Sequence, residues 1–96
     1  MNILNWLEKW YLKNCNGDWE HSFGIKIETL DNPGWSVDID LIDTNLESKP
    51  FLEVKVERSE KNWFLCRVDD GIFKGRGGPQ NLAEMLEIFH KWVGSD

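Results

Sequence analysis

The stretch Asn14–Trp35, NCNGDWEHSFGIKIETLDNPGW, decides the fold, because it joins a helix end to an alternating strand and a reverse turn. Its first residues, 14–17, contain the Asn and Gly that commonly end helices. Apolar and polar residues then alternate over 22–30 with the period of a half-buried strand. Residues 31–34, Asp-Asn-Pro-Gly, predict a turn in which Pro33 suits the second position and Gly34 supplies a positive φ.

One helix is predicted on each side of this stretch. Residues 2–14 carry apolar side chains at steps of three and four, and Asn2 is a suitable N-cap. The same periodicity extends from Pro79 to about Val93, and Asn81 with Glu84 has the spacing of a capping box. The large aromatic residues on these stripes and on the first strands are expected to form the core: Trp6, Trp10, Trp35, Phe89 and Trp92.

Three further strands complete the predicted sheet. Residues 35–41 pair with 22–30 as a hairpin, and 52–57 alternate in the same way. The alternation in 62–69 is less regular, so this strand is either covered on both faces or exposes Trp63 and Leu65. Residues 70–78, DGIFKGRGG, predict a glycine-rich loop with a short extended piece at 72–74.

The predicted fold class is therefore α+β, with one domain over residues 1–96. We expect an antiparallel meander sheet of four or slightly more strands, with both helices packed on one face. The face toward the helices would carry Trp35, Val37, Ile39, Leu52, Val54 and Val56. The opposite face would carry Lys26, Glu28, Asp38, Asp40, Glu53, Lys55 and Glu57.

Charge and composition narrow the possible partners. The 96 residues have a formal charge of −6, which argues against unaided nucleic-acid binding and favours a basic protein partner. No apolar run approaches the roughly 20 residues that span a bilayer, so we expect a soluble protein, and the lack of a signal-peptide pattern favours the cytoplasm. Cys15 and Cys66 lack the spacing of a disulfide framework or a metal site, and we expect both to stay reduced, without a cofactor.

Two regions could carry chemistry. In the region of Trp19, Glu20 and His21, the side chains of Asp18, Glu20 and His21 could form a metal or acid/base site with Cys15 nearby, although residues that are neighbours in a strand point to opposite faces. Gly75–Gly78 before a helix could bind an anion, but the pattern lacks the Lys-Ser/Thr of a phosphate loop. A small enzyme or ligand-binding domain that uses these two regions is therefore the alternative function.

The segments WLEKWYLKNCNGDWEH, GIKIETLDNPGW, FKGRGGPQNL and LEIFHKWV together resemble the Immunity protein 53 family of bacterial polymorphic toxin systems. The resemblance covers nearly the whole chain. It implies a cytoplasmic protein that binds and neutralises a cognate toxin by protein–protein contact. It implies no catalytic residues.

The charged sheet face is the expected binding surface. Asp38, Asp40, Glu53 and Glu57 would form a negative patch that attracts a basic toxin domain. Trp63 would supply a desolvated anchor, and Arg76 is a further candidate contact. In the alternative interpretation, these carboxylates only keep an open sheet soluble.

Overall fold

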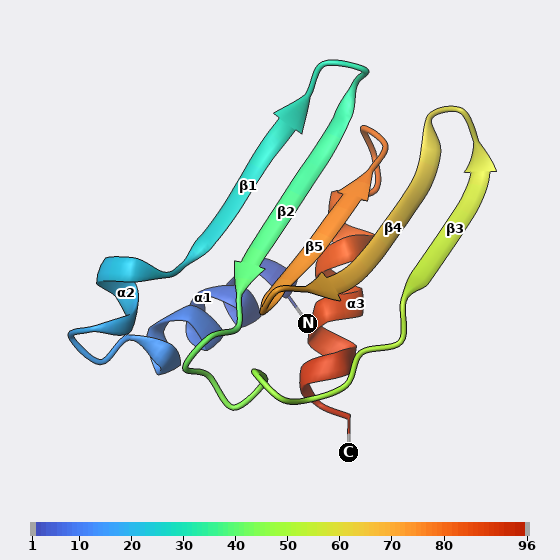
Figure 1. The fold of residues 1–96 in the computed structure, drawn as a ribbon. Helices are drawn as coiled ribbons and strands as arrows, with labels where there is room; N and C mark the ends of the chain where they lie inside the picture. The colour runs from blue at the N-terminus through green and yellow to red at the C-terminus, as the bar shows by residue number, and fades with distance from the viewer. Residues whose placement is uncertain (1, 96) are drawn as a thin grey trace.

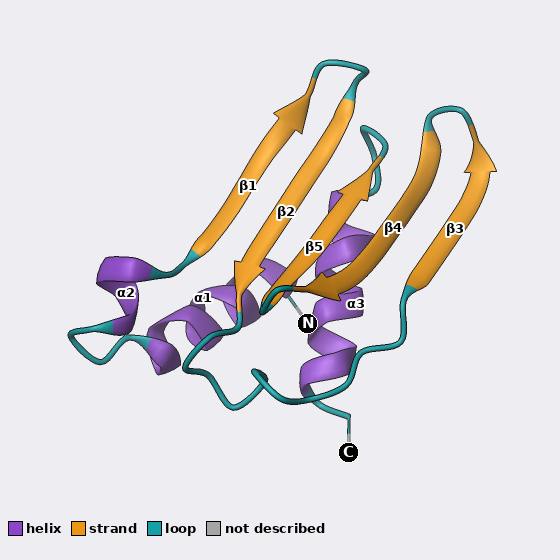
Figure 2. Cartoon of the chain, viewed as in Figure 1, coloured by secondary structure: helices purple, strands orange, loops and turns teal. Residues whose placement is uncertain are grey.

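A computed structural model describes residues 2–95 and shows a five-stranded antiparallel sheet with helices on one face (Figures 1 and 2). The predicted α+β class, with helices near both ends of the chain, is confirmed. The elements in chain order are α1 (Ile3–Asn14), α2 (Trp19–Ser22), β1 (Ile25–Leu30), β2 (Gly34–Asp40), β3 (Val54–Ser59), β4 (Asn62–Asp69), β5 (Ile72–Gly77) and α3 (Leu82–Val93). Within residues 2–95, no helix has both the length and the apolar character to cross a membrane.

The strand order is β1-β2-β5-β4-β3, which differs from a simple meander. Three hairpins are present, β1-β2, β3-β4 and β4-β5, and β5 pairs with both β2 and β4 at the centre. Because β2 and β3 lie on opposite sides of β5, residues 41–53 run along one end of the sheet to connect them (Figure 1).

The central strand β5 occupies most of the segment that was predicted as a loop. Its glycines suggested an irregular chain, yet Asp70 and Gly71 form the turn of a tight hairpin, with φ of 53° and 72°. An Asp-Gly pair in this backbone conformation is a strong hairpin signal. Residues 72–77 also alternate with a period of two, Phe73 facing the core and Lys74 and Arg76 facing away.

The glycines of β5 allow α3 to lie directly on the sheet. A Cβ at Gly75 would be 3.0 Å from the Met85 Sδ, and one at Gly77 would be 3.1 Å from the Met85 Cε. Both distances are shorter than ordinary van der Waals contact. The glycine-rich sequence therefore serves helix–sheet packing, with no side chain between Met85 and the strand.

The β1-β2 turn differs from the predicted geometry. The Asn32–Pro33 peptide bond is cis, and among the described residues the glycines with positive φ are Gly17 and Gly71, not Gly34. Gly34 is the first residue of β2, and a Cβ there would collide with the carbonyl oxygen of Gly77. Close approach of two backbones, and not a positive φ, requires glycine at this position.

Aromatic side chains fill the space between the sheet and the helices. Phe89 lies at the centre, with ring centroids 5.1 Å from Trp10 and 5.0 Å from Phe73. Trp10, Phe89 and Trp92 are buried as predicted, whereas Trp6 and Trp35 are half-buried.

The connection between β2 and β3 is attached to α3 by specific contacts. The Trp92 indole N–H donates to the Pro50 carbonyl at 2.9 Å, and the Lys49 ammonium donates to the Trp92 carbonyl at 2.7 Å. Leu46 is buried, but Leu52 is 89% exposed. The predicted core position for Leu52 is therefore wrong, because β3 begins only at Val54.

We expect Gly34→Ala to destabilise the protein by about 1–3 kcal/mol, because the added methyl group meets backbone that cannot rotate away. Urea denaturation measures this change. Gly24→Ala is the matched control, since a Cβ there has nothing within 4 Å. Equal midpoints for the two variants would contradict the close approach of β2 and β5.

Trp10→Ala should cost about 3–5 kcal/mol of unfolding free energy, because it leaves a cavity among packed aromatic rings. Leu12→Ala on the same helix should change it by less than about 0.5 kcal/mol, since Leu12 is 71% exposed. Thermal and urea unfolding of both variants test the core assignment. A wild-type transition for Trp10→Ala would show that α1 does not pack as described.

Candidate partner-binding surface

The face of the sheet opposite α1 and α3 is not covered by any element of residues 2–95 (Figure 1). We call it the open face. Strand pairing places the following side chains on it: Lys26, Glu28 and Leu30 of β1; Ser36, Asp38 and Asp40 of β2; Ile72, Lys74 and Arg76 of β5; Trp63, Leu65, Arg67 and Asp69 of β4; Lys55 and Glu57 of β3.

The centre of the open face is a hollow whose apolar residue is Leu65. The hollow measures about 250 Å³ and is lined by Leu65, Arg67, Lys74 and Arg76. Leu65 is paired with Arg76 on one side and with Lys55 on the other, while Arg67 is paired with Lys74. A half-buried leucine is thus surrounded by four basic side chains.

Nearby carboxylates pair with these cations. Asp38 Oδ1 accepts from Arg76 Nη1 at 2.9 Å. Asp69 Oδ2 is shared by Lys74 at 3.3 Å and Arg67 at 3.9 Å. The pairs are solvated, so each contributes little to stability, and their main effect is to order the side chains on the face.

The predicted binding residues lie on or near this face, but they do not form a negative patch. Asp38, Glu57, Trp63 and Arg76 lie on it. Asp40 lies at its end and accepts a hydrogen bond from the Gly24 N–H at 2.9 Å, and Glu53 precedes β3 in an exposed position.

The predicted negative patch is wrong because β5 and β4 place basic side chains between the acidic strands. The face carries basic and acidic residues in equal number, namely Lys26, Lys55, Arg67, Lys74 and Arg76 against Glu28, Asp38, Asp40, Glu57 and Asp69. Lys74 was missed as a surface residue of the sheet because its segment was predicted to be mainly loop. The alternation over residues 72–77 was the signal that could have located it.

The structure also resolves the ambiguity in β4. Phe64 and Cys66 face the helices and are buried, whereas Trp63 and Leu65 are half-buried on the open face. Burial raises the pKa of the Cys66 thiol to about 12, so this sulfur is protonated at neutral pH and is not a nucleophile.

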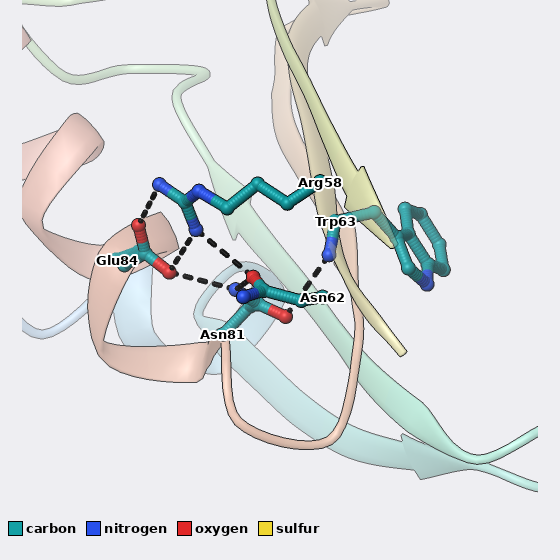
Figure 3. Close-up of polar contacts among 5 residues, drawn as sticks. All are labelled: Arg58, Asn62, Trp63, Asn81 and Glu84. Atoms are coloured by element: carbon teal, nitrogen blue, oxygen red, sulfur yellow. Dashed lines mark hydrogen bonds and ion pairs between the residues drawn. The ribbon is translucent and has the colours of Figure 1, made fainter. Parts of the chain in front are cut away.

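A polar network beside Trp63 connects β3 and β4 to the start of α3 (Figure 3). Asn81 is buried, with 1% of its surface exposed. Its Oδ1 accepts a hydrogen bond from the Trp63 N–H at 3.2 Å, and its Nδ2 donates to the side chains of Asn62 and Glu84. Arg58 makes a two-pronged contact with the Glu84 carboxylate, at 3.0 and 2.8 Å. Asn81 thus joins the strands to the helix instead of capping the helix with its side chain.

This network changes the acid–base properties of Glu84. The hydrogen bond from Arg58, and then that from Asn81, lowers the pKa of the Glu84 carboxyl below its ordinary value of 4.5. Glu84 is therefore ionised at neutral pH and holds β3 against α3. The network also fixes the backbone on which Trp63 projects toward the open face.

The residues of the alternative catalytic hypothesis do not converge. The Glu20 carboxylate accepts from the backbone N–H groups of Asn16 and Gly17, at 2.9 and 2.8 Å, so it closes the turn after α1. A hollow beside α2 is lined by residues that include Asp18 and His21, but not by Glu20 or Arg76. Among residues 2–95, no group of three or more His, Cys, Asp and Glu side chains is placed to hold a metal ion.

Trp19 anchors this turn to the core. It is 3% exposed, packs edge-on against Trp10, and donates its indole N–H to the Ile42 carbonyl at 3.0 Å. The turn is held by Glu20 and by Asn16 Oδ1, which accepts from the N–H groups of Asp18 and Trp19.

A second surface feature lies on the helix side of the molecule. A groove of about 520 Å³ between α1 and the start of β1 is lined by residues that include Leu4, Tyr11 and Phe23. Leu4 is 54% exposed. Its lining contains one charged residue, Glu8, whereas three of the four residues that line the hollow of the open face are basic.

A family model described as Immunity protein 53 matches residues 4–94. This chain belongs to the Immunity protein 53 family. No curated protein and no solved structure matches it. Membership of the Immunity protein 53 family supports a protein partner and a non-enzymatic role.

For this member of the Immunity protein 53 family, we expect the free energy of unfolding to fall as the pH drops below about 4.5, partly through Glu84. The pKa of the Glu84 carboxyl is lower in the folded than in the unfolded protein, so this group stabilises the fold at pH values above its unfolded pKa. The stabilisation is lost as the pH falls and the carboxyl becomes protonated in the folded protein. Glu84→Gln should flatten this acid-side loss. Urea titrations across the acid range measure it.

The control for this experiment is Glu87→Gln, which removes an exposed carboxylate of the same helix outside the network. It should follow the wild-type pH profile. An unchanged profile for Glu84→Gln would show that the contact with Arg58 does not stabilise the fold in solution.

Proposed function

We propose that this protein is an immunity protein that binds the toxin domain of a bacterial polymorphic toxin system and neutralises it in the cytoplasm by protein–protein contact. The main support for this proposal is the open face, a sheet surface that no other layer covers within residues 2–95. The chain that presents it belongs to the Immunity protein 53 family. No catalytic group or cofactor is part of the proposed mechanism.

The open face has the composition of an interface rather than of a surface that is only solvated. Trp63 and Leu65 are half-buried apolar side chains, and charged residues surround them. Interfaces commonly combine aromatic or aliphatic anchors with a polar rim, and Trp and Arg are enriched among the residues that dominate binding energy. Trp63 is therefore the proposed anchor.

Charged residues would set the orientation of the toxin. In this proposal Asp38 and Arg76 act as an ion pair on the face, Glu57 flanks Trp63 on the neighbouring strand, and Asp40 and Glu53 belong to the outer rim. A sheet provides a rigid frame for such contacts, so binding needs little rearrangement of this partner.

The test uses the cognate toxin domain that the proposal implies, sought in the reading frame next to that of this chain. The two proteins should form a complex in size-exclusion chromatography, and the complex should lack the toxin's activity. Trp63→Ala should weaken binding by about thirtyfold, the factor that corresponds to a hot-spot loss of about 2 kcal/mol. Titration calorimetry measures this change.

Tyr11→Ala is the matched control, because it truncates an exposed aromatic residue of α1 beside the groove on the helix side. It should bind as the wild type does. Weakening by Tyr11→Ala and not by Trp63→Ala would place the interface at the groove, and absence of any complex with wild-type protein would contradict the proposed function itself.

A further inference from the structure

We propose that the centre of the open face recognises an acidic segment of the toxin, whose carboxylates pair with Arg67, Lys74 and Arg76 around an apolar side chain placed on Leu65. This inference rests on the proposed function and specifies its partner chemistry. It reverses the expectation of a basic toxin surface that the sequence suggested.

The first argument is the distribution of charge. The chain has a formal charge of −6, yet the open face carries equal numbers of basic and acidic side chains. The net negative charge therefore resides on the rest of the molecule. An acidic segment would be repelled from the other surfaces and would find favourable pairing at the centre of this face.

The second argument is the local arrangement of cations and carboxylates. Arg67 and Lys74 are cross-strand neighbours, and both pair with the single carboxylate of Asp69. The contact from Arg67 is long, at 3.9 Å, and this side chain is 52% exposed. Two cations thus share one acid, and an incoming carboxylate would supply the missing counter-charge.

The third argument concerns Arg76. Within residues 2–95 its polar contacts are made through Nη1, to Asp38 Oδ1 and Gly75 O at 2.9 Å and to Val37 O at 3.5 Å. Nη2 and Nε of the guanidinium are therefore left for a further carboxylate, which a guanidinium binds well through two parallel hydrogen bonds. Asp38 orients this side chain and leaves it able to bind a second acid.

The hollow between these cations indicates which kind of residue should lie next to the acidic residues of the toxin segment. It measures about 250 Å³, and Leu65 is its apolar residue. Such a space accepts one aliphatic side chain, while its basic border pairs with carboxylates on both sides. The preferred toxin segment therefore has one aliphatic residue with Glu or Asp on both sides of it.

A peptide probe tests this chemistry without the toxin. The probe is an acetylated, amidated peptide with three glutamates on each side of one leucine, titrated into the intact, isotope-labelled protein at low salt. We expect amide chemical-shift changes centred on Leu65 and Arg76. The double variant Arg67→Gln/Lys74→Gln should weaken binding about tenfold, because it removes two charge-assisted contacts.

The control double variant is Lys9→Gln/Lys13→Gln, which removes the same charge from the exposed surface of α1. It should bind the probe as the wild type does, and thermal melting should show that both double variants fold. Equal weakening by both, shifts centred elsewhere, or similar shifts with the matching lysine peptide or with a thymidine oligonucleotide would overturn the inference.

The toxin separates this inference from the proposed function. A toxin that binds wild type and fails to bind Arg67→Gln/Lys74→Gln supports both. A toxin that binds both proteins equally overturns the acidic-segment inference and leaves the immunity function intact. A toxin that binds neither contradicts the immunity function, whatever the peptide does.

Discussion

The close packing of α3 on β5 is the constraint on which the rest of the structure depends. Met85 lies over Gly75 and Gly77, where an added Cβ would lie 3.0 Å from the Met85 Sδ and 3.1 Å from its Cε. This contact brings Phe89 onto Phe73 and closes the aromatic core. It also explains why a glycine-rich strand, which has a low intrinsic strand preference, occupies the centre of the sheet: burial and pairing on both sides outweigh the conformational cost of glycine.

The same strand determines the character of the other face. Side chains alternate along β5, so the residues between its core positions, Lys74 and Arg76, must point away from the helices. They insert positive charge between the acidic residues of β2 and the mixed charges of β3. The result is a surface of alternating positive and negative charge, neutral in sum, on an acidic protein. Such a surface discriminates among partners better than a uniformly charged one, because a wrong partner meets like charges or leaves charged groups unpaired.

Much of the architecture was predictable from local patterns. Helical periodicity located α1 and α3, and strict alternation located the β1-β2 hairpin and the inward positions of Val37 and Ile39. The binding surface was predicted less well. The sequence indicates Trp63 and Arg76 as candidates but does not indicate their neighbours on the face. Cross-strand neighbours depend on strand order, and strand order depends on contacts between distant residues.

The sequence by itself determined the secondary-structure periodicity, the division of each strand into an apolar and a polar side, and the acidic net charge, because these properties depend on each residue and its near neighbours. The tertiary structure alone decided that β5 lies between β2 and β4, and therefore that Lys74 and Arg76 separate Asp38 from Glu57. Strand order depends on pairing and packing between segments that are distant in the chain, among them the contact of Met85 with two glycines of β5, and the fit between such segments is not visible in either one alone.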